Sequence, residues 1–409
     1  MNDYLIWFCV LILASAWMWR GKELHEKRAR MTATAILSGL LIASFMPNYW
    51  IAAYTCVFVL GLIRVPSPAD RLPLTVYPAL MFAALYAFLS PLVTLDWVVP
   101  VLWSIVACGG ILALWWAFSM VMSQGHYDKL FQFRGRTFLH IYEHQPVWNV
   151  LPKFCCGQGN ENFAQALAGA AVAASVGLAL LGHPWAWLVA LACSLPCLKI
   201  RGHWWEWPHP TQGCGYLVVI GYAALSVTFG LHVLIGGMLL LGGLTLWTWV
   251  RTPQFWSGRR EIWAWGLEVF KDMSWPGKII GAGPESWLHI FQQDCHLQSK
   301  RLEHQTAFAT HSHNEFINAL VETGVIGLIC MVGYCATTMW GLFQAQTVEA
   351  QAVFVMGACY ISSMMISFVS SLYHEVAFMD RDGAVTGHGM PGMNVVGLAI
   401  VLLAEGVLR

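Results

Sequence analysis

The stretch HSHNEFINALVETGVIG, residues 311–327, places two imidazoles, an amide and a helix start at the edge of an apolar run. Ser312 and Glu315 have the Ser-x-x-Glu spacing of a capping box, so we expect a helix to begin at His313 with Ser312 as its N-cap. In the first helical turn, the positive end of the helix dipole would disfavour the imidazolium, and unpaired N–H groups would attract an anion. The stretch therefore predicts a general base beside an anion site, unless His311 and His313 are simply interfacial residues.

The apolar run that follows is one of many in the chain. Hydrophobic residues make up 57 % of the sequence and charged residues 11 %, with a mean hydropathy of +0.58, whereas soluble domains carry about 25 % charged residues. We expect an all-α polytopic membrane protein with about twelve transmembrane helices, since each helix needs roughly 17 to 25 residues to span the bilayer. The predicted spans are residues 4–19, 31–46, 49–63, 73–91, 97–122, 163–182, 184–200, 213–230, 231–250, 325–341, 351–372 and 392–408.

Nearly all charged residues lie in the connections between these runs. We treat residues 1–409 as a single integral membrane domain in which residues 251–312 form a large catalytic loop, because long loops are usually functional. The net charge of zero argues against nucleic acid as a partner. With this span count, nearly all Lys and Arg residues fall on the face that carries residues 251–312, which the positive-inside rule assigns to the cytoplasm.

Three landmarks around the loop carry a resemblance to a known family. The string His313-Asn314, nine residues, Gly324, two residues, Gly327 follows the segments Ser257–Trp263 and Gly281–Trp287. In this order they resemble the landmarks of bacterial O-antigen ligases, O-antigen polymerases and protein O-oligosaccharyltransferases. The resemblance implies a membrane glycosyltransferase bundle of the GT-C-like type in the bacterial inner membrane, with the loop facing the periplasm. It also implies that His313 is the essential histidine. We follow it against the positive-inside rule, because long loops translocate largely regardless of charge.

Arginines are the residues expected to bind the substrate. Arg259, with Trp263 four residues on, matches the Arg-x-x-x-Trp pattern of the family. A guanidinium suits a pyrophosphate because it donates forked hydrogen bonds, and we favour Arg259 over Arg260 for this role. The alternative is that both arginines extend to the lipid headgroups and that Trp256 and Trp263 belong to the aromatic belt.

Other candidate residues rest on weaker patterns. Arg201 precedes a glycine, as in the second substrate-binding arginine of the family, although an alternative alignment removes this cation. Asp380, in the loop before the last span, is the candidate acid that orients the catalytic imidazole, by the logic of a catalytic triad. His311 and Asn314, beside His313, complete the set of candidate substrate-binding residues.

The resemblance implies transfer of a glycan from a polyprenyl pyrophosphate carrier to an acceptor hydroxyl of lipid A-core, another glycan or a protein. The donor already has a good leaving group, so neither a metal nor a cofactor is expected, and direct attack would invert the anomeric carbon. Three functions stay open: a ligase, a polymerase of repeat units, and a membrane metalloenzyme that uses His311, His313 and other loop histidines. Chelation should abolish only the last activity. A transporter is disfavoured because no charged residue lies at the centre of a predicted span.

Overall fold

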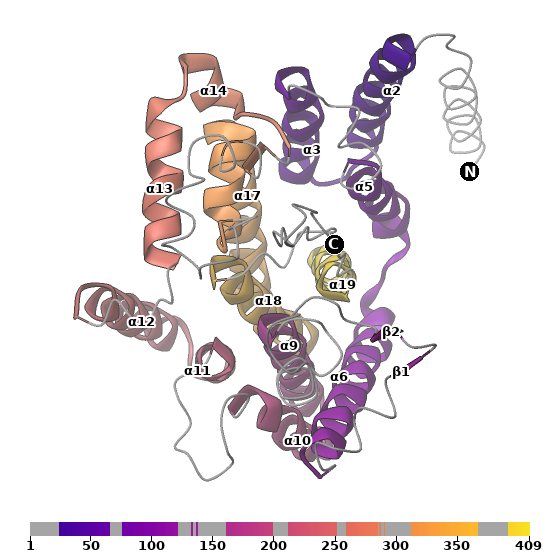
Figure 1. Cartoon of the computed structure of the whole chain (residues 1–409). Helices are drawn as coiled ribbons and strands as arrows, with labels where there is room; N and C mark the ends of the chain where they lie inside the picture. Colours follow the sequence, from indigo (N-terminus) through magenta and orange to yellow (C-terminus); the bar gives the residue numbers. More distant parts are fainter. Residues whose placement is uncertain are drawn as a thin grey trace. The chain divides into compact units, whose positions relative to one another are not determined.

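The computed structural model in Figure 1 describes the chain as a set of helices. The described residues are 24–65, 76–121, 132–133, 136–137, 161–198, 212–251, 259–284, 286–287, 290, 312–366 and 392–409. Within these ranges the sole strands are β1 (Gln132–Phe133) and β2 (Arg136–Thr137), two residues each, which pair antiparallel. The predicted all-helical class is confirmed for this part of the chain.

Every predicted span from residue 31 onward overlaps a helix, and the run 4–19 lies outside the described residues. The helices are α2 (Leu24–Ser44), α3 (Tyr49–Gly61), α5 (Tyr77–Leu89), α6 (Val98–Val121), α9 (Glu161–Leu180), α10 (Ala186–Leu198), α11 (Gln212–Phe229), α12 (Leu231–Arg251), α13 (Arg259–Asp272), α14 (Trp275–Ile280), α17 (Glu315–Ala345), α18 (Val348–Ile366) and α19 (Gly392–Leu408), with short 3-10 turns η1 (Leu62–Arg64), η3 (Ser90–Leu92) and η4 (Leu95–Trp97).

Among the described helices, two are by themselves long and apolar enough to cross a membrane, Glu315–Ala345 and Val348–Met365. A third is added if the sharply bent pair 79–92 and 95–111 forms one span. Seven further apolar helices are shorter. The structure thus supports a membrane protein, while the number of spans stays a prediction.

The chain divides into two compact units. Unit 1 comprises residues 1–92, 256–337 and 372–389, and unit 2 comprises residues 93–255, 338–371 and 390–409. In unit 2 the alanine-rich helix α9 is buried among its neighbours. Close packing there depends on small residues, because a side chain at Gly109 would overlap Ala171 of α9.

Unit 1 contains most of the residues that the sequence singles out, including His313 and Arg259. Its helix α3 is capped by Asn48, whose Oδ1 accepts hydrogen bonds from the N–H groups of Trp50 at 3.0 Å and Ile51 at 3.4 Å. A Cβ at Gly333 of α17 would lie 2.8 Å from the indole of Trp50, and one at Gly61, where α3 ends, would lie 3.1 Å from Pro284. Helix α3 therefore runs antiparallel to α17 and brings its C-terminal end to the 281–284 turn.

The polar segment 251–312 contributes α13 and α14 to unit 1. Helix α13 is amphipathic: Ile262 and Trp265 are buried, whereas Leu267 and Glu268 are exposed. Figure 1 shows α13 and α14 beside the part of α17 with which their residues are in contact. The described part of the predicted catalytic loop is therefore two packed helices rather than an extended linker.

Candidate functional site

Helix α17 begins at Glu315, two residues later than the capping-box pattern predicts. The N-cap is Asn314, whose Oδ1 accepts hydrogen bonds from the N–H groups of Phe316 at 3.0 Å and Ile317 at 3.1 Å. Ser312 forms the turn before the helix, because its Oγ accepts a hydrogen bond from the Asn314 N–H at 3.2 Å. The assignment of Ser312 as the N-cap is therefore wrong. Asn and Ser cap helices about equally well, and the local spacing did not decide between them.

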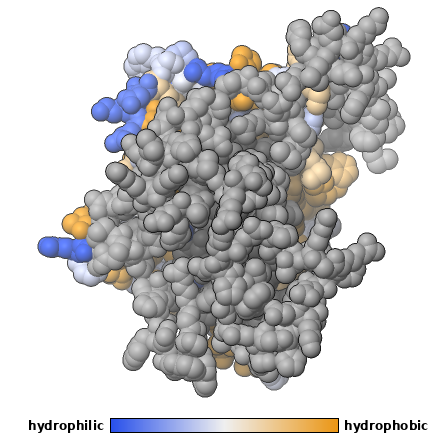
Figure 2. Space-filling model, in the orientation of Figure 1, coloured by the Kyte–Doolittle hydropathy of each residue, from blue (hydrophilic) through white to orange (hydrophobic). Residues whose placement is uncertain are grey.

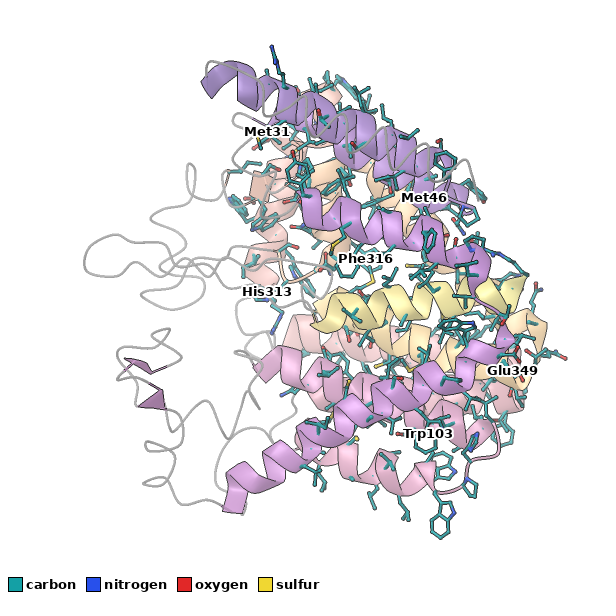
Figure 3. The ribbon with its side chains drawn as sticks, turned by 90° about the vertical axis from the view of Figure 1, so that its right-hand side faces the viewer. Met31, Met46, Trp103, His313, Phe316 and Glu349 are labelled. Atoms are coloured by element: carbon teal, nitrogen blue, oxygen red, sulfur yellow. The ribbon has the colours of Figure 1, made fainter. Side chains whose placement is uncertain are left out.

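The later start of α17 changes the surroundings of His313. The residue precedes the N-cap and has a left-handed backbone with φ of 53°, so it is not in the first helical turn. The N–H groups of Phe316 and Ile317 are already bonded to Asn314, which weakens the predicted anion site at this helix end. His313 itself is half-buried at the start of α17, where Figure 3 shows it near Phe316.

The nine residues between Asn314 and Gly324 form one short helical segment. At Gly324 the backbone leaves the helical region, with φ of 69° and ψ of −168°, and α17 kinks. An unbroken helix would bond the carbonyls of Val321 and Glu322 to N–H groups four residues later. Here they accept hydrogen bonds from the N–H groups of Ala282 and Gly283, both at 2.9 Å. The kink therefore joins the 281–284 turn to the helix that follows His313. We call this pairing the glycine latch.

The glycines of the latch are required by their backbone geometry. Gly281 has φ of 77° and ψ of −175°, and like Gly324 it occupies a region that is essentially restricted to glycine. A Cβ at Gly281 would overlap the Glu322 carbonyl, and a Cβ at Gly324 would overlap Ile279 O and Gly281 N. The glycines of two sequence landmarks therefore lie against each other.

Helix α13 joins the same assembly through aromatic packing. Trp265 meets Trp287 edge to face, with ring centroids 5.1 Å apart and planes at 88°. Ile262 and Val321 complete this buried cluster, and Trp263 packs against it. Trp263 is only partly buried against the cluster, so the alternative in which it is a belt residue stays open.

Glu322 is a residue that the sequence analysis missed. Glu322 is 8 % exposed, and its Oε1 accepts a hydrogen bond from the Trp287 N–H at 3.4 Å. Glu322 thus holds both ends of the 283–287 segment, with its backbone oxygen at Gly283 and its side chain at Trp287. Glu315, seven residues earlier, is 5 % exposed. Acidic residues beside an apolar run are a signal of function or special structure, and they could have been singled out on that basis.

The other candidate residues are placed only in part. Arg259 is the first residue of α13 and is half-buried, and Arg260 follows it. Arg201, His311 and Asp380 lie outside the described residues, so their roles stay predictions. In the described part of the chain, no three His, Cys, Asp or Glu side chains are grouped to bind a metal ion. This observation does not test the metalloenzyme hypothesis, which involves His311.

Most of the described helices are apolar, as in polytopic membrane proteins. A histidine stands at the start of one helix, and this helix is hydrogen-bonded to a polar segment. Together these features indicate the class of protein, a membrane protein with a site at a helix start. The family model described as O-antigen ligase matches residues 169–332, which include all three landmarks. A protein described as "Exopolysaccharide production protein ExoQ", from Rhizobium meliloti (strain 1021), is 28 % identical over 130 residues. That alignment covers 30 % of this chain and 29 % of the relative. The two matches confirm that the chain resembles the superfamily of O-antigen ligases and polymerases.

Proposed function

We propose that the protein is an O-antigen ligase-like membrane glycosyltransferase, which moves a glycan from a polyprenyl pyrophosphate carrier to an acceptor hydroxyl. The observation that carries this proposal is the packing of the three landmarks in unit 1. Residues 281–283 bond to the helix that follows His313, and α13, which begins with Arg259, packs on Trp287 and Val321. The residues that match the family pattern thus belong to one packed structure.

The proposed reaction is a direct displacement. The acceptor oxygen forms the new glycosidic bond while the bond between the anomeric carbon and the pyrophosphate oxygen breaks. The acceptor proton passes to His313, and the pyrophosphate leaves with its charge compensated by Arg259. General base catalysis typically contributes about a hundred to ten-thousand-fold, and each charge-assisted hydrogen bond roughly 1.5–3 kcal/mol. A single displacement inverts the anomeric carbon.

A left-handed residue just ahead of a helix cap is a suitable place for such a base. The Asn314 cap and the glycine latch at Gly324 fix both ends of the short helical segment. The backbone of His313 is therefore held on its C-terminal side. Its half-buried side chain keeps access to an acceptor. This arrangement supports a base that is positioned by the fold rather than by a metal ion.

Polymerisation of repeat units is the second candidate function. It is favoured by the relative from Rhizobium meliloti, whose name assigns it to exopolysaccharide production. The chemistry would be the same, with a growing glycan in place of lipid A-core as the acceptor. Deleting the gene in its host separates the two: bare lipid A-core with intact lipid-linked polymer indicates a ligase, and single repeat units on the core indicate a polymerase. Activity in the presence of a chelator would exclude the metalloenzyme.

The proposal puts the protein in the bacterial inner membrane, with the 251–312 loop on its periplasmic side. In unit 1, Met31 of α2 lies toward the same end as His313, and Met46 lies toward the other (Figure 3). The basic start of α2 therefore shares the end that carries His313, and by the positive-inside rule this end would be cytoplasmic. The conflict can be tested with Cys295 as the single cysteine of a variant. Labelling by an impermeant thiol reagent in cells with a permeabilised outer membrane supports the proposal, and labelling only after inner-membrane lysis contradicts it.

The role of His313 is tested by His313→Ala with His311→Ala as the matched control. We expect His313→Ala to abolish transfer while protein abundance and donor binding stay largely intact. His311→Ala should cost less, because it matches no position in the spacing to Gly324. Normal transfer by a well-expressed His313→Ala variant would refute the base assignment.

A further inference from the structure

A second basic site lies where α3 ends against α14. Arg64, the last residue of η1, places its Nη2 atom 3.2 Å from the point where a Cβ of Gly277 would lie. Ser274 Oγ is 3.5 Å from the same point. Gly277 is buried, and its missing side chain lets the guanidinium approach the turn of α14. Two hydrogen-bond donors from segments far apart in sequence therefore converge on one glycine.

Within the described residues, the charge of Arg64 is not paired with an acid. No carboxylate in the described part of the chain forms a salt bridge with this guanidinium, and Arg64 is half-buried. Lys278, the residue after Gly277, is also half-buried and adds a second positive charge to the same turn. A partly buried cation without a counterion costs free energy, so this pair of cations favours an anionic ligand.

The surface around these cations is apolar. Ile63 is 72 % exposed, Trp275 78 % and Ile279 43 %. Figure 2 shows hydrophobic and hydrophilic residues side by side over α14 and the adjoining end of α13. Exposed aliphatic and Trp side chains next to Arg and Lys are the combination that suits the boundary between acyl chains and headgroups.

We propose that this site binds the phosphodiester group of an anionic membrane phospholipid. Arg64 donates paired hydrogen bonds to the phosphate oxygens, as its forked geometry permits, while Ser274 adds a hydroxyl donor and Lys278 a second charge. The acyl chains lie against Ile63, Trp275 and Ile279. The lipid would thereby bridge the end of α3 and the connection between α13 and α14.

The glycan donor is a poorer fit to this position. Arg64 contacts α14, which follows the C-terminal end of α13, whereas Arg259 begins α13. Fourteen helical residues separate these ends, which corresponds to about 20 Å at 1.5 Å per residue. One pyrophosphate cannot reach both arginines. The lipid site is therefore separate from the proposed reaction and does not rest on it.

Native mass spectrometry of the full chain, purified in a mild detergent, tests the proposal. We expect the wild-type protein to retain one species with the mass of an anionic phospholipid. Loss of a charge-assisted interaction of at least 1.4 kcal/mol in Arg64→Gln should reduce this occupancy roughly tenfold or more. Arg251→Gln, which removes an exposed arginine at the end of α12, is the matched control and should retain the lipid.

Ser274→Ala keeps the test decisive if Arg64→Gln fails to fold. Its hydroxyl is exposed and caps no backbone group of α14, so the variant should fold normally and lose roughly two- to tenfold in occupancy, as one neutral hydrogen bond predicts. A wild-type protein without a bound phospholipid overturns the proposal, as does equal retention in all variants. A retained species with the mass of a polyprenyl phosphate would assign Arg64 to the donor and also overturn it.

Discussion

Gly324→Ala is the substitution that most directly tests the glycine latch. For a residue with a side chain, adopting the backbone conformation of Gly324 costs about 1–3 kcal/mol of free energy. A Cβ would also overlap Ile279 O and Gly281 N, so the turn at 281–283 must move away. The hydrogen bonds to the carbonyls of Val321 and Glu322, both 2.9 Å long, would then be lost at roughly 1–3 kcal/mol for each buried group left unpaired.

The sum is about 3–9 kcal/mol, which is large for one methyl group. We expect the thermal unfolding midpoint of the detergent-purified protein to fall by at least about 5 °C, and glycan transfer to fall with it. Gly242→Ala is the matched control, because Gly242 lies in α12 with no atom within 4 Å of its added Cβ, and alanine is the better helix former. A Gly324→Ala protein with the midpoint and activity of the wild type would show that the kink and the latch do not exist in solution.

Three further predictions concern individual side chains. His313→Ala should lower transfer about a hundred to ten-thousand-fold in a membrane assay with lipid-linked donor, with the protein still abundant; a change of less than twofold contradicts the proposed base. Arg259→Lys should lose roughly tenfold or more of its activity, because an ammonium cannot form the guanidinium fork, whereas Arg260→Lys should be mild. If both lysine variants are fully active, the arginines anchor headgroups. Glu322→Ala should lower the free energy of unfolding by about 1–3 kcal/mol because the Trp287 N–H loses its acceptor; Glu322→Gln, which keeps an oxygen there, should stay close to the wild type in the same thermal assay, and equal loss in both variants would assign the effect to charge.

The sequence predicted the helices well because span length and hydrophobicity are local properties. The runs 97–122, 213–230 and 231–250 match α6, α11 and α12 to within one residue at each end. Helix starts were harder to predict. Ser312 and Asn314 are both good cap residues, and the choice of Asn314 emerges only from its hydrogen bonds to residues 316 and 317.

The sequence indicated which segments belong to the candidate site, but not how these segments pack against one another. Nothing local indicates that Gly324 breaks a helix, because a glycine within an apolar run is equally compatible with an unbroken span. The break depends on the 281–283 turn, which supplies N–H donors for the two freed carbonyls. The same limit applies to Arg64, which looks like an ordinary arginine at a span end until its approach to Gly277 is known.

In this chain, the nine-residue spacing that resembles the superfamily pattern has a physical cause. It is the length of the helical segment between the Asn314 cap and the Gly324 kink. Gly327 belongs to the same constraint, because a Cβ there would overlap the Thr323 hydroxyl, which donates a hydrogen bond to Ala319 O at 2.7 Å. These glycines therefore report how closely two backbones pack and how a histidine is held, and they carry no information about the acceptor. Under the proposed function, the residues that choose between lipid A-core, a glycan and a protein lie elsewhere, so exchanging acceptor specificity between relatives should leave residues 313–327 unchanged.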